Sequence, residues 1–233
     1  MTLVVPDEPG QCAPTVSRPG RRRRHRPDDE VTLILDGALA VMRRNGYAEA
    51  SVADILDEAG LSTRAFYRHF DSKDALLRAV YRRDADAVAA ELRAATEAAP
   101  DPVTALEAWL DGFLALFFDH RRAERVAIMV SEGTRRAAGY HEEEERAVAA
   151  IVAPLIEILR KGSATGALRS DAPIRDAYAV YAVATSASGS RRTLEAGRFD
   201  RRAARDHVAR FCWPALGLDA PDHAGGRRRS RTA

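Results

Sequence analysis

The segment from Ser51 to Lys73 most constrains the fold, because it contains both a helix stop and a helix restart. Ser51 stands where an N-cap is expected and Asp54 follows three residues later. Gly60 then ends this helix, since glycine adopts the left-handed conformation that closes a helix C-terminus, and Ser62 starts the next one. Four apolar residues at helical spacing form the inner face of the first helix: Val52, Ile55, Leu56 and Ala59. The segment therefore predicts two short helices joined by a tight turn.

The second of these helices has a basic outer face. Phe66 and Phe70 are four residues apart and must point inward together. The side chains left outward are Thr63, Arg64, Tyr67, Arg68 and His69. This layout is typical of a helix-turn-helix whose second helix enters the major groove of DNA. A solvated helical hairpin is the alternative interpretation of the same pattern.

The strings Ala59-Gly60-Leu61-Ser62 and Phe66-Tyr67-Arg68-His69-Phe70-Asp71-Ser72-Lys73-Asp74-Ala75-Leu76 closely resemble the recognition segment of TetR-like (tetracycline-repressor-like) transcriptional regulators. The resemblance covers roughly residues 28–80. It implies a ligand-responsive repressor that binds a pseudo-palindromic operator on double-stranded DNA as a homodimer. A helical interaction or architectural protein, whose helix-turn-helix is not used for operator-specific control, remains the alternative.

The same resemblance assigns individual contacts. By position in the motif, Thr63, Arg64 and Ala65 read bases, an arginine favouring guanine and an alanine methyl favouring the thymine methyl. The positions that match phosphate contacts are Tyr67, His69 and Lys73. Ser51 caps its helix and also meets the DNA backbone, while Arg68 serves either purpose.

The whole chain is expected to be all-α. It has 233 residues, few aromatic residues, and no sustained alternation of apolar and polar residues. We expect a disordered basic arm (1–27), a three-helix DNA-binding domain (28–80), a larger helical ligand-binding and dimerisation domain (81–218), and a disordered basic tail (219–233). A helix from Lys73 to about Ala98 has no proline or glycine inside it, so it would join the two domains rigidly.

Charge is unevenly distributed along the sequence. Ten of the 36 basic residues and four of the 34 acidic residues lie in 1–27 and 219–233, which leaves 26 basic and 30 acidic residues in between. The run from Arg21 to Arg26 is either a solvated charge cluster or an arm that lies in the minor groove beside the recognition helix. An acidic body with basic ends argues for local DNA-binding surfaces instead of nonspecific polycation binding.

The location expected for this protein is the cytoplasm. Cys12 and Cys212 lie at opposite ends of the sequence without metal-type spacing, which favours a reduced compartment. The N-terminus has no signal-peptide pattern, and the longest apolar run, Ala147 to Ile156, is too short to cross a membrane.

Aromatic residues concentrate in the helix expected after Pro102. They form either plain core or the wall of an apolar cavity for a small-molecule effector. The candidate ligand-binding residues are Trp109, Phe113, Phe117, Met129 and Tyr178. Further helices are expected over Glu124–Ala138 and Tyr140–Lys161, with a kink at Pro154.

The small residues from Thr185 to Ser190 allow close helix approach. With Val208, Phe211 and Trp213 on the last helix, they favour a four-helix dimer interface, intrachain packing being the alternative. We expect no cofactor, no metal and no enzyme activity. His141 and Glu145 share a helix face, but an acidic first helical turn explains them better than a metal site, and no catalytic motif occurs.

Overall fold

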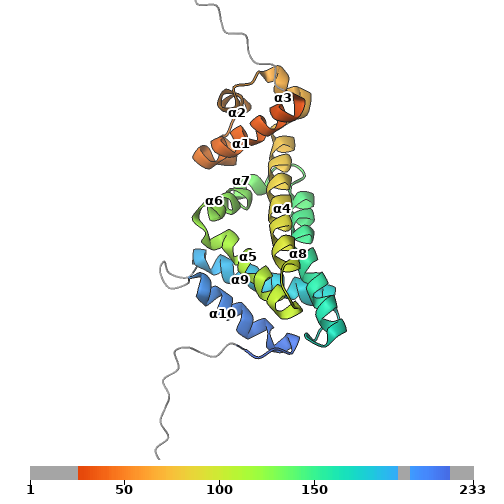
Figure 1. Ribbon diagram of the computed structural model, residues 1–233. Coiled ribbons are helices and arrows are strands. Elements are labelled where there is room, and N and C mark those ends of the chain that lie inside the picture. The colour runs from red at the N-terminus through yellow and green to blue at the C-terminus, as the bar shows by residue number, and fades with distance from the viewer. Residues whose placement is uncertain (1–25, 194–199, 221–233) are drawn as a thin grey trace, which may run out of the picture.

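The computed structural model describes residues 26–193 and 200–220, and within them every regular element is a helix (Figure 1). Four helices follow from the N-terminal part of the sequence: α1 (Pro27–Glu49), α2 (Val52–Ala59), α3 (Thr63–His69) and α4 (Lys73–Glu97). The first three form a small unit at one end of the molecule, and α4 runs from this unit into a larger bundle (Figure 1). The expected all-α fold is confirmed.

The caps expected from the sequence form the helix-turn-helix. The Ser51 hydroxyl accepts a hydrogen bond from the Asp54 amide (3.1 Å), and the Asp54 carboxylate accepts from the Ser51 amide (3.2 Å). Gly60 has φ 68° and ψ 26°, the left-handed conformation that other residues adopt only with strain. Ser62 and Ser72 cap α3 and α4 in the same way as Ser51 caps α2. The turn between α2 and α3 is therefore fixed by local interactions.

The core of the small unit extends beyond residue 80. Its buried side chains come from α1 to α4 and include Ile34, Met42, Phe66 and Leu76. Met129 and Ala137, from the larger part of the chain, are buried in the same cluster. The small unit and the larger bundle are therefore packed against each other, and residues beyond position 80 complete the core of the small unit.

The larger bundle contains seven further elements: α5 (Pro102–Phe118), α6 (His120–Met129), α7 (Glu132–Arg135), α8 (Tyr140–Thr165), α9 (Pro173–Thr193), α10 (Arg201–Cys212) and a short 3-10 helix, η1 (Pro214–Leu216). The prediction of a single helix over Glu124–Ala138 is wrong. Helix α6 ends at Met129, and α7 begins after Ser131, which is its N-cap. The Thr134 hydroxyl stabilises this break by donating to the Ile128 carbonyl (2.7 Å).

The second core is centred on α5 and α8. Trp109, Leu110 and Leu114 of α5 are fully buried against Leu155 and Leu159 of α8. The helix α8 continues through Pro154, whose ring nitrogen has no hydrogen to donate. Near this proline, the Trp109 indole donates to the Ile151 carbonyl (3.0 Å), so the buried tryptophan finds a polar partner.

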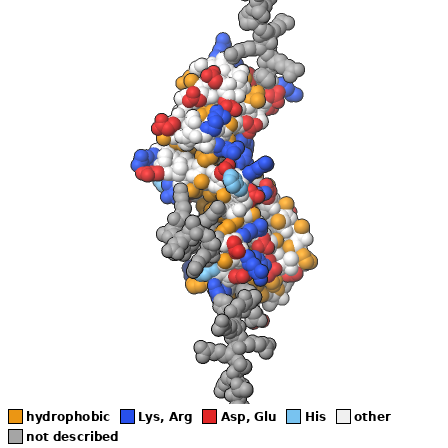
Figure 2. All heavy atoms as spheres, turned by 90° about the vertical axis from the view of Figure 1, so that its left-hand side faces the viewer, with side chains coloured by type: hydrophobic (Ala, Val, Ile, Leu, Met, Phe, Trp, Pro, Cys, Tyr) orange, Lys and Arg blue, Asp and Glu red, His pale blue; other side chains and the backbone are white. Residues whose placement is uncertain are grey.

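The surface carries both signs of charge. Figure 2 shows basic and acidic side chains interspersed over one long face of the molecule. Many of them are paired, for example Arg43 with Glu124 (3.0 Å), which joins α1 to α6, and Arg83 with Asp36 (2.8 Å), which joins α4 to α1. Within residues 26–193 and 200–220, no helix combines the length and apolarity that crossing a membrane needs.

Candidate nucleic-acid interface

The outer face of α3 presents exposed side chains as the sequence predicts. Thr63, Arg64, Tyr67 and Arg68 are exposed, whereas Phe66 is fully buried. The Tyr67 ring is 60% exposed and rests edge-on against Phe66, with ring centroids 5.2 Å apart. Arg64 makes no hydrogen bond or ion pair with any residue in the described part of the chain. The start of α3 therefore offers a free guanidinium and a hydroxyl to the solvent.

Among the three expected base readers, Thr63 and Arg64 are exposed, whereas Ala65 is buried. Its side chain is only 4% exposed, because the first turn of α3 packs against α1 and α2. The methyl group thus faces the protein core in this conformation, and its predicted contact with a thymine methyl stays a prediction. Helical spacing predicts correctly that Phe66 points inward. However, α3 has only seven residues and contacts both α1 and α2, so the neighbouring Ala65 is buried as well.

The other end of α3 is tied to α1 by an acidic residue that the sequence analysis did not single out. Glu30 is 8% exposed, and its Oε2 lies 2.8 Å from an Arg68 Nη and 3.0 Å from His69 Nε2. The hydrogen bond with His69, together with the charge of Arg68, holds the pKa of the Glu30 carboxyl below its ordinary value. The Nε2 of His69 therefore faces the protein and not the solvent.

Lys73 is occupied inside the protein. Its Nζ donates to the carbonyls of Tyr47 (3.1 Å), Ala48 (3.2 Å) and Ala50 (3.1 Å), and lies 4.5 Å from the centroid of the Tyr47 ring. Gly46, with φ 77°, interrupts α1 near its end, so the last carbonyls lack helical partners. An ammonium group has three donors, and all three are used here. These contacts give Lys73 a capping role at the end of α1, and its predicted phosphate contact stays a prediction.

The Ser51 hydroxyl also has internal partners. Besides accepting from the Asp54 amide, it donates to Asp54 Oδ2 (2.6 Å). The hydrogen bonds that the Ser51 hydroxyl and the Ser51 amide donate to the Asp54 carboxylate lower the pKa of that carboxyl. The predicted N-cap is confirmed. To donate a hydrogen bond to a DNA phosphate, the Ser51 hydroxyl would have to give up its hydrogen bond to Asp54.

A second group of contacts connects the helix-turn-helix to the larger bundle. Asp74, at the start of α4, accepts from the Tyr47 hydroxyl and from the Ala138 amide (3.0 Å). The hydrogen bond from Tyr47 is the largest cause of the lowered pKa of Asp74. Arg78, one turn later, donates to the Ala138 carbonyl (2.6 Å). Both polar groups of residue 138, which precedes α8, are therefore held by α4; we call these contacts the Ala138 clamp.

The five candidate ligand residues do not come together in one site. Trp109 and Phe113 are buried, with parallel rings 5.1 Å apart, and Phe117 lies beside them, 5.3 Å from Phe113. Met129 is instead buried in the core that contains α1, and Tyr178 is 40% exposed on the outside of α9. The end of α6 directs Met129 toward α1, and Tyr178 faces outward from α9, so neither residue joins the aromatic cluster of α5.

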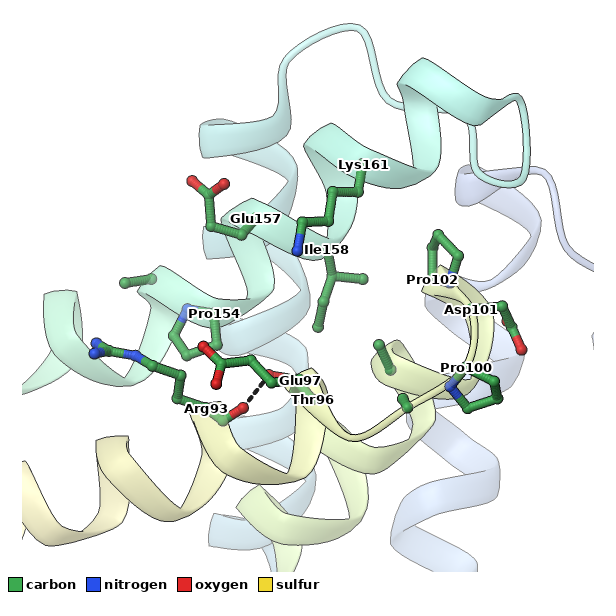
Figure 3. Close-up of a pocket in the computed structure, with 13 residues that line it drawn as sticks. Arg93, Thr96, Glu97, Pro100, Asp101, Pro102, Pro154, Glu157, Ile158 and Lys161 are labelled. Carbon is green, nitrogen blue, oxygen red and sulfur yellow. Dashed lines mark hydrogen bonds between the residues drawn. The ribbon is translucent and has the colours of Figure 1, made fainter.

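A surface groove lies at the end of α4 farthest from α3 (Figure 3). The end of α4 and its link to α5 form one side, and α8 around Pro154 forms the other. Its volume is about 460 Å³, and its lining is Arg93, Thr96, Glu97, Ala99, Pro100, Asp101, Pro102, Ala105, Ala153, Pro154, Glu157, Ile158 and Lys161. Charged side chains of both signs border it, and it contains none of the five candidate ligand residues.

The last two helices pack together and leave large apolar side chains outside. Ala177, Val180 and Ala184 of α9 are buried, as are Val208 of α10 and the following Trp213. Val208 and Trp213 therefore serve intrachain packing and not the predicted dimer interface. The exposed apolar side chains of this pair are Ile174 (55%), Tyr178 (40%) and Phe211 (70%). Exposed apolar side chains that form one contiguous patch mark a contact site.

The His141 side chain is paired within its own helix. His141 Nδ1 lies 3.7 Å from Glu144, its neighbour on the first turn of α8. The described residues contain no group of three or more His, Cys, Asp or Glu side chains arranged to hold a metal ion.

Comparison with known proteins supports the resemblance seen in the sequence. Residues 34–80 match the family model described as bacterial regulatory proteins, tetR family. A search of curated protein sequences gives no match to this chain.

Solved structures match over most of the chain. A TetR transcription regulator from Haloarcula marismortui ATCC 43049 is 19% identical, with a TM-score of 0.67 over 81% of this chain and 98% of that one. A transcriptional regulator from Saccharomonospora viridis in complex with choline is 18% identical, with a TM-score of 0.68 over 81% and 98%. The regulator FadR from Bacillus subtilis in complex with stearoyl-CoA is 15% identical, with a TM-score of 0.63 over 76% and 94%.

Proposed function

We propose that this chain is a dimeric, ligand-responsive repressor of the TetR type. Residues 34–80 match the family model of bacterial regulatory proteins, tetR family, and the chain is similar in fold to a TetR transcription regulator. It would act in the cytoplasm on a pseudo-palindromic operator. The observation that carries this proposal is the outer face of α3, where exposed polar and cationic side chains stand on a rigid helix-turn-helix. A helix of this kind fits the major groove.

The contacts proposed with DNA follow the geometry of α3. Arg64 and Thr63 at its start read base edges, since they are exposed and Arg64 has no protein partner in the described chain. Tyr67, on the same outer face, donates its hydroxyl to a phosphate. Ala65 is left out of the readers because it is buried, and Lys73 is left out of the phosphate contacts because its donors are used.

We propose that α9 and α10 form the dimer interface. The exposed apolar side chains Ile174, Tyr178 and Phe211 lie on these two adjacent helices. A two-fold interface uses the same patch on both subunits and would place two copies of α3 on successive turns of the DNA groove. Spacing of the half-sites by about one helical turn then follows from the symmetry.

We propose that an effector enters the larger bundle near Phe117 and acts through α4. The Phe117 ring is partly exposed beside the buried stack of Trp109 and Phe113, so this is where an apolar ligand meets the aromatic cluster. The relatives crystallised with choline and with stearoyl-CoA support a ligand-binding role for this fold. The Ala138 clamp supplies the route, because movement of α8 pulls directly on Asp74 and Arg78 at the start of α4.

Operator reading is tested with the Arg64→Ala variant. The parent protein should select an inverted repeat from random genomic fragments. On that repeat, Arg64→Ala should lose about 1–3 kcal/mol of binding free energy and relax the preference at one base pair of each half-site, because a bidentate arginine contact is lost. Fluorescence anisotropy with the selected duplex and its single-base variants measures both effects. Selection of no inverted repeat, or an unchanged base preference in the variant, contradicts the proposal.

Transmission of the effector signal is tested with the Arg78→Ala variant. The exposed start of α3 is untouched, so operator affinity should change less than about threefold, while release of DNA by an effector should weaken by about 5-fold or more. A thermal-shift screen that begins with choline and stearoyl-CoA supplies the effector, and DNA release is followed by anisotropy. The matched control is Arg93→Ala, which shortens another arginine of α4, about four helical turns beyond Arg78. If the effector releases DNA equally well from both variants, the Ala138 clamp does not transmit the effector signal.

A further inference from the structure

Glu30 is an acidic residue buried against the recognition helix. It lies in the first turn of α1, yet both of its side-chain partners, Arg68 and His69, belong to α3. A single oxygen, Oε2, meets both partners, at 2.8 Å and 3.0 Å. The Glu30 side chain is 11% exposed, so a carboxylate here depends on these partners for its stabilisation.

The pairing changes what Arg68 can do at a DNA surface. Its side chain is 51% exposed, so the guanidinium stands at the surface with one Nη held by Glu30. An arginine that swings freely is drawn to any phosphate and adds affinity without sequence information. An arginine held by a carboxylate keeps its other N–H groups in a fixed direction, and its net attraction for phosphate is reduced by the adjacent negative charge.

We propose that Glu30 is a positioning residue that sets the sequence specificity of this protein, by holding Arg68 so that it adds to binding of the correct site and not to binding of DNA in general. The proposal rests on the proposed function of α3 in reading DNA. It also explains why an acidic residue, Glu30, is placed against the helix that faces DNA, although its negative charge repels phosphate.

The variant Glu30→Gln frees Arg68 from its ion pair and keeps the size of the side chain. Its affinity for a scrambled duplex should rise about 5- to 10-fold at low salt, and the plot of log affinity against log salt should steepen by about 0.9, the slope of one added phosphate contact on duplex DNA. The ratio of operator affinity to scrambled-duplex affinity should fall by a similar factor. Anisotropy titrations with both duplexes over a salt series measure these quantities.

Two matched variants separate this proposal from a general charge effect. Asp28→Asn removes one negative charge from the same turn of α1 and should leave the salt slope unchanged, because in the described residues no hydrogen bond or ion pair joins this carboxylate to α3. Adding Arg68→Ala to Glu30→Gln should cancel the gain on scrambled DNA. If Asp28→Asn reproduces the gain, or if the double variant keeps it, the proposal is overturned.

The single variant Arg68→Ala tests the proposal without altering Glu30. With the arginine held, its loss should lower operator affinity and leave scrambled-duplex affinity and its salt slope nearly unchanged. A loss on both duplexes with a shallower slope means that Arg68 binds phosphate freely, which overturns the proposal even if Glu30→Gln does not fold. Because the scrambled duplex needs no known operator, these outcomes stay distinct from a failure to find an inverted repeat.

Discussion

Phe211→Glu should convert the dimer to a monomer and lower the affinity for a duplex with two half-sites by about 100-fold or more. The Phe211 side chain is 70% exposed on α10, so the change costs the folded monomer little, whereas a dimer interface would have to bury the new charge. The large effect on DNA follows from avidity, because each subunit of a dimer holds the second near its own half-site. Sedimentation and anisotropy with duplexes carrying one or two half-sites measure both losses.

The matched control introduces the same charge at an exposed apolar position outside α9 and α10. Ala149→Glu, on α8, should leave both the mass of the assembly and the operator affinity unchanged. Affinity for the single half-site should also remain the same in Phe211→Glu, because α3 is untouched. A parent protein that sediments as a monomer, or a Phe211→Glu protein that remains a dimer, would place the interface elsewhere.

The helix-turn-helix could be predicted in detail because its determinants are local. The hydrogen bonds of Ser51 with Asp54 join residues three positions apart, and the conformation of Gly60 depends on its own missing side chain. Periodicity likewise identifies which residues of a helix face inward, as it does for Phe66 and Phe70. Such features need no knowledge of the rest of the fold.

Roles that depend on distant partners could not be predicted in this way. Lys73 meets carbonyls 23 to 26 residues away in the sequence, and Glu30 meets His69 over 39 residues. A motif position gives the direction of a side chain on its helix, but not the polar groups that another helix brings to it. For this reason the sequence could predict neither the capping contacts of Lys73 nor the contacts of Glu30 with α3.

Packing between helices set the other limit. An aromatic residue at helical spacing is buried equally well as core or as cavity wall, so the pattern of α5 left both interpretations open. In the structure the rings of Trp109 and Phe113 are almost fully buried and stacked on one another, which favours packed core. The position of Met129 could not be predicted either. Helix α6 ends at this residue, and its side chain is buried in the core that contains α1.

Phe113→Ala should therefore act first on stability. The Phe113 ring is 2% exposed and contacts three other aromatic rings, at centroid distances of 5.1 Å (Trp109), 5.3 Å (Phe117) and 5.4 Å (Tyr181). Removing a buried ring of this kind costs about 3–5 kcal/mol, partly through lost transfer free energy and partly through the cavity left behind. Urea unfolding at one fixed protein concentration measures the loss.

The size of that loss decides what Phe113 does. Phe117→Ala is the matched comparison, because this ring is only partly buried and its removal should cost about 1–2 kcal/mol. If Phe113 is packed core, benzene should raise the unfolding midpoint of Phe113→Ala and not that of the parent protein, since only the variant holds a new apolar cavity. A loss below about 1 kcal/mol would mean that the ring faces open space, and the effector site would then extend to Phe113 itself.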